Sequence, residues 1–555
     1  MGFRLAFVRL FNRKNLKRFA RELDQPRAAQ ERRLSELLAL EADAGYFRER
    51  GGTPRMSVDA FRKAIPVCTY DDLWPYIEPL VERGNVGARG TVTAQSVSMF
   101  LKTSGTTGRP KLLPVTPEYE AETDRGRRVW IERMIAEDER NSLGAHFTIV
   151  SPAQESRTRG GLPVGSNTGR IFMRQPEWLR LFSAAPYDAC GLTDFDLRYY
   201  AILRHAVAKG DVGTLTTANP STVLLLCRKI MELGDELAEA IATGHFGRPL
   251  DDAGVVPLWH RDSVAASLQK GLEANPKRAA EVRRVLSDGE SGLLERLWPQ
   301  LTTVNCWLGG HAPIYMERLR PFLGDIPARD PGFSASEGLF AIPVRSGTPE
   351  GVLHNSGPFM EFVPEGESNT HTLLSHELEV GCRYRLIVTT GGGLWRYDMQ
   401  DVVEVTGKMG ATPLVRFLYK SGGTLSITGE KVTEGHAVAV ATQLARQLAI
   451  DEACATLQLA DPPHYLVAVE AGGGSDAEIS LAWDDAMKAV NVEYAEKRGS
   501  GRLGPAVARR VPGGSFAAWR RRRVEAGAPD GQVKLPPLLP DVEALFDGPM
   551  FEVER

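Results

Sequence analysis

The chain has 555 residues, of which 43% are hydrophobic and 25% charged, and its formal net charge is −3. This length exceeds what a single hydrophobic core supports, so we expect at least two domains. The composition is that of an ordinary globular protein, and the near-zero charge provides no overall field that would attract nucleic acid or an anionic membrane.

The cysteines and the N-terminal stretch indicate where such a protein works. The six cysteines are scattered, without a Cys-x-x-Cys pair or metal-ligand spacing, which is typical of reduced thiols in the cytoplasm. Basic residues interrupt the apolar ones throughout residues 1–24, so this stretch is not a secretory signal. It suits an amphipathic helix, which either touches a membrane surface or packs on the protein body. We expect packing, and a soluble cytoplasmic protein.

The first half of the chain mixes helical and strand-like patterns. Helical periodicity runs over residues 27–50, and residues 61–84 predict a short strand followed by a helix. From about residue 96 to 230, apolar strand-like runs alternate with helices, one of which has Asn219 as its cap and a proline in its first turn. Residues 232–300 have a polar helical pattern.

The second half is richer in strands. Glycine turns separate strand-like segments beyond residue 300, and past residue 430 helices alternate with strands, which we place at 464–470 and 478–483. These patterns predict a large α/β domain over residues 1–422 and a small α+β domain over residues 423–555. Glycines permit large backbone changes, so the segment 419–423 is the expected hinge.

A segment near residue 105 has the character of a phosphate-binding loop. KTSGTTGRPKLLP (102–114) offers hydroxyl groups and closely approachable backbone amides, which suit a pyrophosphate or triphosphate. The Walker pattern is absent, and Lys111 leads directly into apolar residues, so we expect a loop that joins two strands. The alternative is an exposed turn rich in small residues. The candidate nucleotide-binding residues are Thr103, Ser104, Gly105, Thr106, Thr107 and Gly108.

Further motifs accompany this loop and together resemble a known family. TSGTTGRPK (103–111) resembles the phosphate loop of the adenylate-forming superfamily, which includes acyl-CoA synthetases, luciferase and adenylation domains. Within it, the chain most resembles the Gretchen Hagen (auxin-responsive) family of acyl acid amido synthetases and its bacterial relatives. The late segments NVEYAEKRGSGRLGP and GQVKLPP are the ones that point away from CoA ligases. The resemblance implies a large N-terminal domain with mixed sheets, flanking helices and a β-barrel-like part, and a small mobile C-terminal domain.

The segment GFSASEG (332–338) resembles the family's aromatic-Gly-x-Ser-Glu motif. The match implies that Phe333 stacks on adenine and that Glu337 coordinates the Mg²⁺ that neutralises the leaving pyrophosphate. The family's usual glycine is a serine here. The remaining nucleotide-binding residues that this match implies are Ser334, Ala335 and Ser336.

LWRYDMQD (394–401) corresponds to the family's Tyr-Arg-x-Gly-Asp motif. The match implies that Asp401 accepts hydrogen bonds from both ribose hydroxyls. The sequence departs from the family at Asp398, where arginine is usual, and at Gln400, where glycine is usual. Arg396 is the neighbouring residue that we expect to substitute in part for the missing arginine.

Two lysines complete the site that the resemblance implies. FLYKSGG (417–423) resembles the superfamily's hinge and places Lys420 near the nucleotide. PDGQVKLPP (529–537) resembles the family's Gln-hydrophobic-Lys-x-Pro-Arg stretch, although its last residue is proline rather than arginine. This match makes Lys534 the mobile lysine that steadies the α-phosphate during adenylation. Lys534 and Lys111 are the catalytic candidates.

The resemblance implies a ligase that uses ATP and Mg²⁺ to form carbon–nitrogen bonds. A carboxylic acid attacks the α-phosphorus of ATP, pyrophosphate leaves, and an amino acid amine takes the acyl group with release of AMP. Two alternatives stay open: an acyl-CoA ligase, and a catalytically silent nucleotide-binding homologue suggested by the altered motif before Asp401. We expect a monomer whose partners are a small acyl acid and an amino acid, without nucleic acid or membrane; the sequence names neither substrate.

Overall fold

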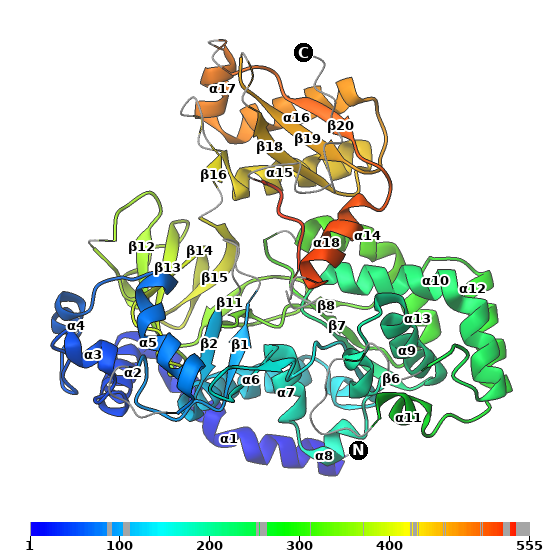
Figure 1. Ribbon diagram of the computed structural model, residues 1–555, viewed down its shortest axis with the longest axis horizontal. Coiled ribbons are helices and arrows are strands. Elements are labelled where there is room, and N and C mark those ends of the chain that lie inside the picture. Colours follow the sequence, from blue (N-terminus) through cyan, green and yellow to red (C-terminus); the bar gives the residue numbers. More distant parts are fainter. Residues whose placement is uncertain are drawn as a thin grey trace. The chain divides into compact units, whose positions relative to one another are not determined.

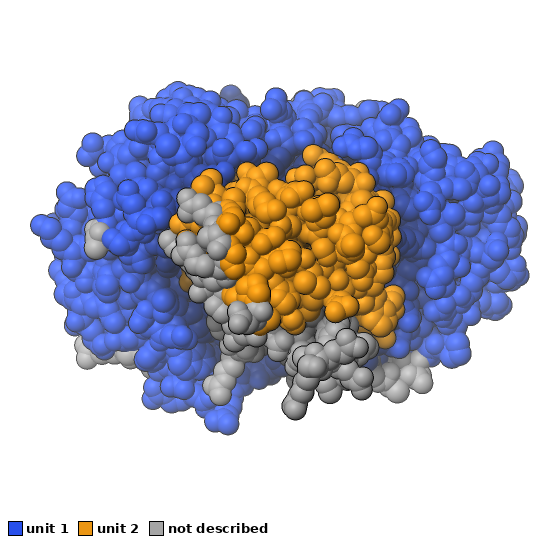
Figure 2. Space-filling model, turned by 90° about the horizontal axis from the view of Figure 1, so that it is seen from above, with its two compact units in different colours: residues 1–309, 315–399, 404–416 blue, residues 310–314, 400–403, 417–555 orange. Residues whose placement is uncertain are grey.

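The computed structural model describes residues 2–85, 91–103, 111–250, 255, 263–310, 312–369, 371–421, 424–425, 430, 432–458, 460, 462–499, 501, 503–525 and 533–539, with the backbone alone at residues 2–11, 314, 424 and 496. Two compact units are coloured separately in Figure 2. Unit 1 comprises residues 1–309, 315–399 and 404–416, and unit 2 comprises residues 310–314, 400–403 and 417–555. The domain boundary expected after residue 422 stays a prediction, because residues 422 and 423 lie outside the described residues.

One core of unit 1 surrounds a parallel four-stranded sheet of order β3-β6-β7-β8. Helices α10 (Pro220–Thr243) and α12 (Pro276–Ser287) lie side by side (Figure 1) next to this sheet. They bury their apolar faces with α9 (Phe195–Ala208) and α13 (Leu293–Leu297) around Trp298, which is fully buried. As the sequence predicted, α10 begins after Asn219, whose side chain accepts a hydrogen bond from the backbone N–H of Ser221. The strands are β3 (Ala145–Thr148), β6 (Val212–Thr216), β7 (Thr303–Asn305) and β8 (Ala328–Arg329).

Two further sheets carry most of the predicted site segments. A mixed four-stranded sheet has the order β2-β1-β5-β4, and a seven-stranded sheet has the order β12-β13-β14-β15-β11-β10-β9. The first consists of β1 (Met99–Lys102), β2 (Leu112–Val115), β4 (Ser156–Arg157) and β5 (Pro163–Gly165). The second consists of β9 (Phe333–Ala335), β10 (Gly338–Pro343), β11 (Gly351–Leu353), β12 (Phe359–Pro364), β13 (Arg383–Thr389), β14 (Tyr397–Met409) and β15 (Thr412–Lys420).

The helices that surround these sheets are α1 (Gly2–Asp24), α2 (Pro26–Leu40), α3 (Gly45–Glu49), α4 (Val58–Ala64), α5 (Tyr70–Arg83), α6 (Pro117–Glu137), α7 (Asn167–Met173), α8 (Glu177–Arg180), α9 (Phe195–Ala208), α10 (Pro220–Thr243), α11 (Val264–Gln269), α12 (Pro276–Ser287), α13 (Leu293–Leu297) and α14 (Ala312–Leu323). The strand expected before α5 is not formed: residues 58–64 are helical, and only Cys68 makes an isolated bridge, to Tyr397. The mixed α/β architecture matches the predicted fold class.

The N-terminal helix α1 packs against the rest of unit 1, as the sequence predicted. Its side chains are described from Asn12 onward. Phe19 is buried with Val129 of α6 and Val352 of β11, and Asn12 Nδ2 donates a 3.0 Å hydrogen bond to Glu132 Oε1. All six cysteines are free thiols. Within the described part of the chain, every helix is too short or too polar to cross a bilayer.

Unit 2 is an α+β structure, as the sequence predicted. It contains the pair β16 (Thr424–Leu425) and β17 (Val432–Thr433), and the sheet β18 (Ala453–Gln458), β19 (His464–Val469) and β20 (Val507–Arg510), in that order. Its helices are α15 (Glu434–Leu448), α16 (Asp476–Val490), α17 (Val492–Gly499) and α18 (Ser515–Glu525). The strand predicted at residues 464–470 is confirmed as β19.

The strand predicted at residues 478–483 was wrong, because this segment lies inside α16. Ser475 and Glu478 form a reciprocal capping box that begins the helix. Ile479, Trp483 and Met487 then recur every four residues and are buried on one helix face. Six residues are too few to distinguish this spacing from the alternation of a strand. The helix is recognised from its cap and from the four-residue spacing of apolar residues over its full length.

Asp484 in α16 is expected to make the stability of unit 2 depend on acidity. This residue is buried and accepts hydrogen bonds from Arg498 Nε at 2.7 Å, Tyr494 Oη at 2.6 Å and Lys488 Nζ at 2.7 Å. Burial opposes ionisation, but these donors outweigh burial and hold the pKa of Asp484 below its usual value of 3.8. A depressed carboxyl pKa stabilises the fold above the ordinary value, and the stabilisation is lost as pH falls through the folded pKa.

We therefore expect Asp484→Asn to lower the free energy of unfolding by about 3 kcal/mol at pH 7. Urea titrations should show that the difference from the wild type shrinks as the pH falls below about 4. The control is Asp485→Asn, an exposed neighbour that pairs only with Lys488 among the contacts described, with an effect of less than about 1 kcal/mol. A pH-independent deficit would contradict this account.

Candidate active site

The ends of the proposed phosphate loop are held together by a hairpin. Strands β1 and β2 are antiparallel with Lys102 opposite Leu112, and the backbone N–H of Thr103 donates a 3.0 Å hydrogen bond to the carbonyl of Lys111. The expectation that this segment joins two strands is confirmed. The other predicted residues of the loop, Ser104, Gly105, Thr106, Thr107 and Gly108, lie outside the described residues.

Lys111 contacts two tyrosines, Tyr70 and Tyr397, and the motifs did not predict either contact. Its ammonium donates a 3.1 Å hydrogen bond to Tyr397 Oη and lies 5.6 and 5.7 Å from the ring centroids of Tyr70 and Tyr397. Aromatic faces attract a cation at such distances. A single tyrosine in a sequence is ordinarily a core residue, so no sequence signal identified Tyr70.

The segment predicted to bind adenine forms a tight turn of the seven-stranded sheet. Phe333 and Ala335 lie in β9, and Ser336 and Glu337 make the turn into β10. Phe333 and Glu337 are both half-buried. Tyr119 in the first turn of α6 donates a 2.7 Å hydrogen bond to the backbone carbonyl of Ser336 and so holds the turn in place.

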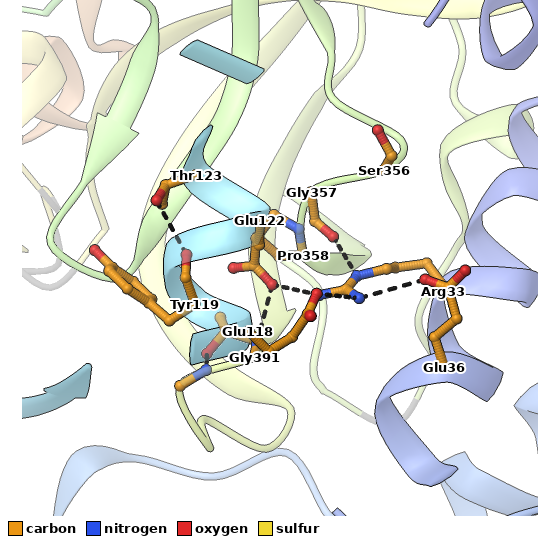
Figure 3. Close-up of polar contacts among 12 residues, drawn as sticks. Arg33, Glu36, Glu118, Tyr119, Glu122, Thr123, Ser356, Gly357, Pro358 and Gly391 are labelled. Carbon is orange, nitrogen blue, oxygen red and sulfur yellow. Dashed lines mark hydrogen bonds and ion pairs between the residues drawn. The ribbon is translucent and has the colours of Figure 1, made fainter. Parts of the chain in front are cut away.

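The beginning of α6 also holds the glycine turn that precedes β14. The side chain of Thr116 donates to the carbonyl of Gly391. The backbone N–H of Gly391 donates to Glu122 Oε2 at 3.0 Å (Figure 3). A Cβ atom at Gly391 would lie 2.7 Å from Glu118 Cγ, so only glycine permits this approach. Helix α6 therefore contacts two segments of the candidate site, and it directly follows the strand that begins after Lys111.

A buried ion pair anchors α6 to α2. Arg33 Nη2 lies 2.7 Å from Glu122 Oε2, its Nη1 lies 2.8 Å from Glu118 Oε1, and its Nε donates a 2.6 Å hydrogen bond to the carbonyl of Gly357 (Figure 3). Glu122 is fully buried. Burial raises the pKa of the Glu122 carboxyl, while the Arg33 guanidinium and the Gly391 N–H act in the opposite direction. The pair is thus part of the support beneath the candidate site.

Asp401 and Lys420, which two different motifs nominated, are brought together. Asp401 lies on β14 and is 6% exposed, and Lys420 ends β15 with its Nζ 2.7 Å from Asp401 Oδ1. The lysine orients the carboxylate that the motif assigns to the ribose. Gln400 has a φ of +59°, a left-handed conformation that favours glycine, the residue usual in the motif at this place.

Arg396 does not substitute for the missing arginine of this motif. Its Nε and Nη2 donate to the two carboxylate oxygens of Glu361 at 2.8 and 3.0 Å, and its Nη1 donates to the carbonyl of Ile65 at 2.8 Å. The residue is 5% exposed. Its guanidinium is therefore engaged inside unit 1, and the expectation from the sequence is corrected. Asp398, which stands where the motif usually has arginine, pairs instead with Arg385: its Oδ2 lies 3.4 Å from Arg385 Nε.

Lys534 belongs to an ordered segment of unit 2. The neighbouring Val533 and Leu535 are buried with Phe516 and Trp519 of α18. Further along, the carbonyl of Pro537 accepts a 2.8 Å hydrogen bond from Ala455 N–H in β18, and Leu539 N–H donates 2.9 Å back to the Ala455 carbonyl. Lys534 itself is half-buried, so packing on both sides defines its backbone position.

The described candidates are divided between the two units. Unit 1 carries Thr103, Lys111 and the segment 333–337, whereas unit 2 carries Asp401, Lys420 and Lys534. Among the described residues, no three histidine, cysteine or acidic side chains are grouped to hold a metal. A single half-buried carboxylate such as Glu337 fits Mg²⁺, which commonly binds through one or two carboxylates and the phosphates of a substrate.

Comparison with known proteins identifies the family. Models of the GH3 family N-terminal, central and C-terminal domains match residues 15–328, 351–420 and 435–543. The chain is 28% identical to indole-3-acetic acid-amido synthetase GH3.8 of Oryza sativa subsp. indica, over 92% of this chain and 87% of the relative. It is 23% identical to the 4-substituted benzoates-glutamate ligase GH3.12 of Arabidopsis thaliana, over 94% of both.

The fold is likewise that of this family. The structure of the AtGH3.15 acyl acid amido synthetase in complex with 2,4-DB superposes with a TM-score of 0.82 at 22% identity, covering 96% of this chain and 94% of that one. The similarity extends over both the large and the small domain that the sequence motifs implied. The chain therefore belongs to the GH3 family of acyl acid amido synthetases, the family that its motifs resemble.

Proposed function

We propose that this GH3 family member activates a small carboxylic acid with ATP and then transfers the acyl group to an amino acid. The observation that supports the proposal best is the charged residue retained in each of four motifs: Lys111, Glu337, Asp401 and Lys534. In the first step the carboxylate attacks the α-phosphorus and pyrophosphate leaves. In the second step an amine attacks the acyl-adenylate carbonyl, the amide forms and AMP leaves.

Each residue has a role that its chemistry suits. Lys111 and Lys534 place positive charge beside the phosphates where negative charge develops. Asp401 accepts hydrogen bonds from the ribose hydroxyls, and Phe333 provides an aromatic face for adenine. Glu337 would hold Mg²⁺, which would supply charge neutralisation for the leaving pyrophosphate. Thr103 and the residues that follow it offer hydroxyl and amide donors to phosphate oxygens.

An amine is the proposed acceptor, and CoA is the second candidate. The amine is favoured because the curated relatives are named as amido synthetases or amino acid ligases, among them a jasmonoyl–L-amino acid synthetase of Nicotiana attenuata. The silent-binder alternative rests on the altered motif at Asp398 and Gln400. A monomeric state and a cytoplasmic location stay predictions.

Acid-dependent ATP–pyrophosphate exchange tests the proposal. A panel of aromatic, cyclic and aliphatic carboxylic acids is supplied with ATP and Mg²⁺, and each of the twenty amino acids or CoA is then added while AMP is followed. Exchange with an acid, followed by AMP release and amide formation with an amino acid, is the expected result. Thioester formation with CoA would replace the acceptor, and ATP binding without exchange under any condition would support the silent homologue.

A further inference from the structure

We propose that Tyr70 is a positioning residue for Lys111, which it holds at the end of the phosphate loop during adenylation. The inference rests on the function proposed above and adds a residue outside the four motifs. Tyr70 is the first residue of α5, and its hydroxyl and its ring both face the start of β2.

The Tyr70 hydroxyl completes the hydrogen bonding at an open strand edge. Strand β2 lies at the edge of its sheet. Because Thr103 N–H bonds to the Lys111 carbonyl on the β1 side, the polar backbone groups of the next residue, Leu112, face away from β1. Tyr70 Oη donates to the Leu112 carbonyl at 3.0 Å and accepts from the Leu112 N–H at 2.8 Å. The Tyr70 hydroxyl thus makes the two hydrogen bonds that a neighbouring strand would otherwise make with the residue after Lys111.

The ring acts on the lysine side chain itself. The Lys111 ammonium lies 5.6 Å from the Tyr70 ring centroid and within hydrogen-bond distance of Tyr397 Oη, so two aromatic side chains limit where it can lie. Burial raises the pKa of the Tyr70 phenol. The hydroxyl therefore stays neutral at physiological pH and keeps the proton that it donates.

Tyr70 is itself held by its neighbours in the sequence. Thr69 donates from both its backbone N–H and its hydroxyl to Asp72 Oδ2 at 2.8 Å, which fixes the start of α5. Cys68 N–H donates to the Arg396 carbonyl at 3.1 Å and the Cys68 carbonyl accepts from Asp398 N–H at 2.9 Å. Residues 68–70 therefore connect the end of the phosphate loop to Tyr397 at the start of β14.

This connection matters because a lysine acts on phosphate as a mobile point charge. Small displacements of a charged group from a reacting phosphate are costly, and a misplacement of 1 Å lowers rates by up to about 10²-fold. The two hydrogen bonds between Tyr70 and Leu112 hold the backbone next to Lys111. The rings of Tyr70 and Tyr397 limit the position of the Lys111 ammonium. We infer that Tyr70 contributes to ATP use through Lys111 rather than through contact with the acid.

The first test compares Tyr70→Phe with the wild type in acid-dependent ATP–pyrophosphate exchange. Phenylalanine keeps the ring and removes both hydrogen bonds to Leu112. We expect a roughly tenfold lower kcat/KM for ATP, with the KM for the acid unchanged. The matched control is Tyr76→Phe in the same helix, whose hydroxyl contacts Glu49 and Arg50. Equal kcat/KM for ATP in Tyr70→Phe and Tyr76→Phe would overturn the inference.

A double-mutant cycle separates positioning from a merely structural role. If Tyr70 acts through Lys111, Tyr70→Phe should cause no further loss of exchange in a Lys111→Ala background. If the fold-loss of exchange in the double variant equals the product of the two single losses, the inference is overturned, while the proposed function stays in place. If the wild type shows no exchange with any acid, the proposed function fails, and the inference fails with it.

Hydrogen exchange at the Leu112 amide checks that the variant loses the intended contact. Tyr70→Phe should exchange this amide at least roughly tenfold faster than the wild type, because the acceptor of that N–H is gone. The Tyr76→Phe protein should keep the wild-type rate. An unchanged rate in Tyr70→Phe would show that the hydroxyl does not hold Leu112 and would also overturn the inference.

Discussion

Replacing Lys534 by alanine is expected to lower acid-dependent ATP–pyrophosphate exchange by about 10²- to 10³-fold, the loss typical of removing one preorganised group that stabilises transition-state charge. The proposed role places this ammonium at the α-phosphate, where negative charge increases as the carboxylate attacks. Because Lys534 is half-buried and its flanking residues Val533 and Leu535 provide the packing, the substitution should leave the fold of unit 2 intact. Thermal unfolding of the same samples checks this.

The matched control is Lys497→Ala, because Lys497 is another half-buried lysine of unit 2, to which the sequence analysis assigned no catalytic or nucleotide-binding role. Its exchange rate should stay within about twofold of the wild type, since the proposed mechanism gives this ammonium no contact with the phosphates. If Lys534→Ala also stayed within tenfold of the wild type, Lys534 would not be the group that steadies the α-phosphate.

Replacing Arg33 by methionine is expected to lower the free energy of unfolding by about 3–5 kcal/mol, because it leaves the buried Glu122 carboxylate without its charged partner. Arg33 is 1% exposed and makes ion pairs with Glu122 and Glu118. Methionine has similar length and is compatible with a helix, so the lost charge is the main change. Urea unfolding followed by tryptophan fluorescence measures the loss.

The pH dependence identifies the cause. Without the guanidinium, the folded pKa of Glu122 rises further above its unfolded value, so the folded state takes up a proton more readily and the deficit shrinks as pH falls. The control is Arg32→Met, its half-exposed neighbour, whose buried partner Glu22 keeps a second ion pair with Arg18, so the loss should be less than about 1 kcal/mol. A deficit in Arg33→Met no larger than in Arg32→Met would contradict the account.

Local sequence patterns predicted several elements of the fold correctly. The cap at Asn219 and its following proline marked the start of α10, and Lys111 followed by apolar residues marked β2 as the strand after a loop. Such signals work because they arise from backbone chemistry within a few residues. The segment 478–483 was mistaken for a strand, because its helical period becomes evident only over the fifteen residues of α16.

The short motifs were enough to identify the family, the α/β class and the residue types that suit nucleotide chemistry, because the meaning of each motif is local. Which distant residues contact one another became evident only in the folded chain. Arg396 pairs with Glu361, Asp401 with Lys420, Arg33 with Glu122, and Tyr70 with the residue after Lys111. These hydrogen bonds and ion pairs depend on distances of about 3 Å between groups far apart in sequence, which no local pattern specifies.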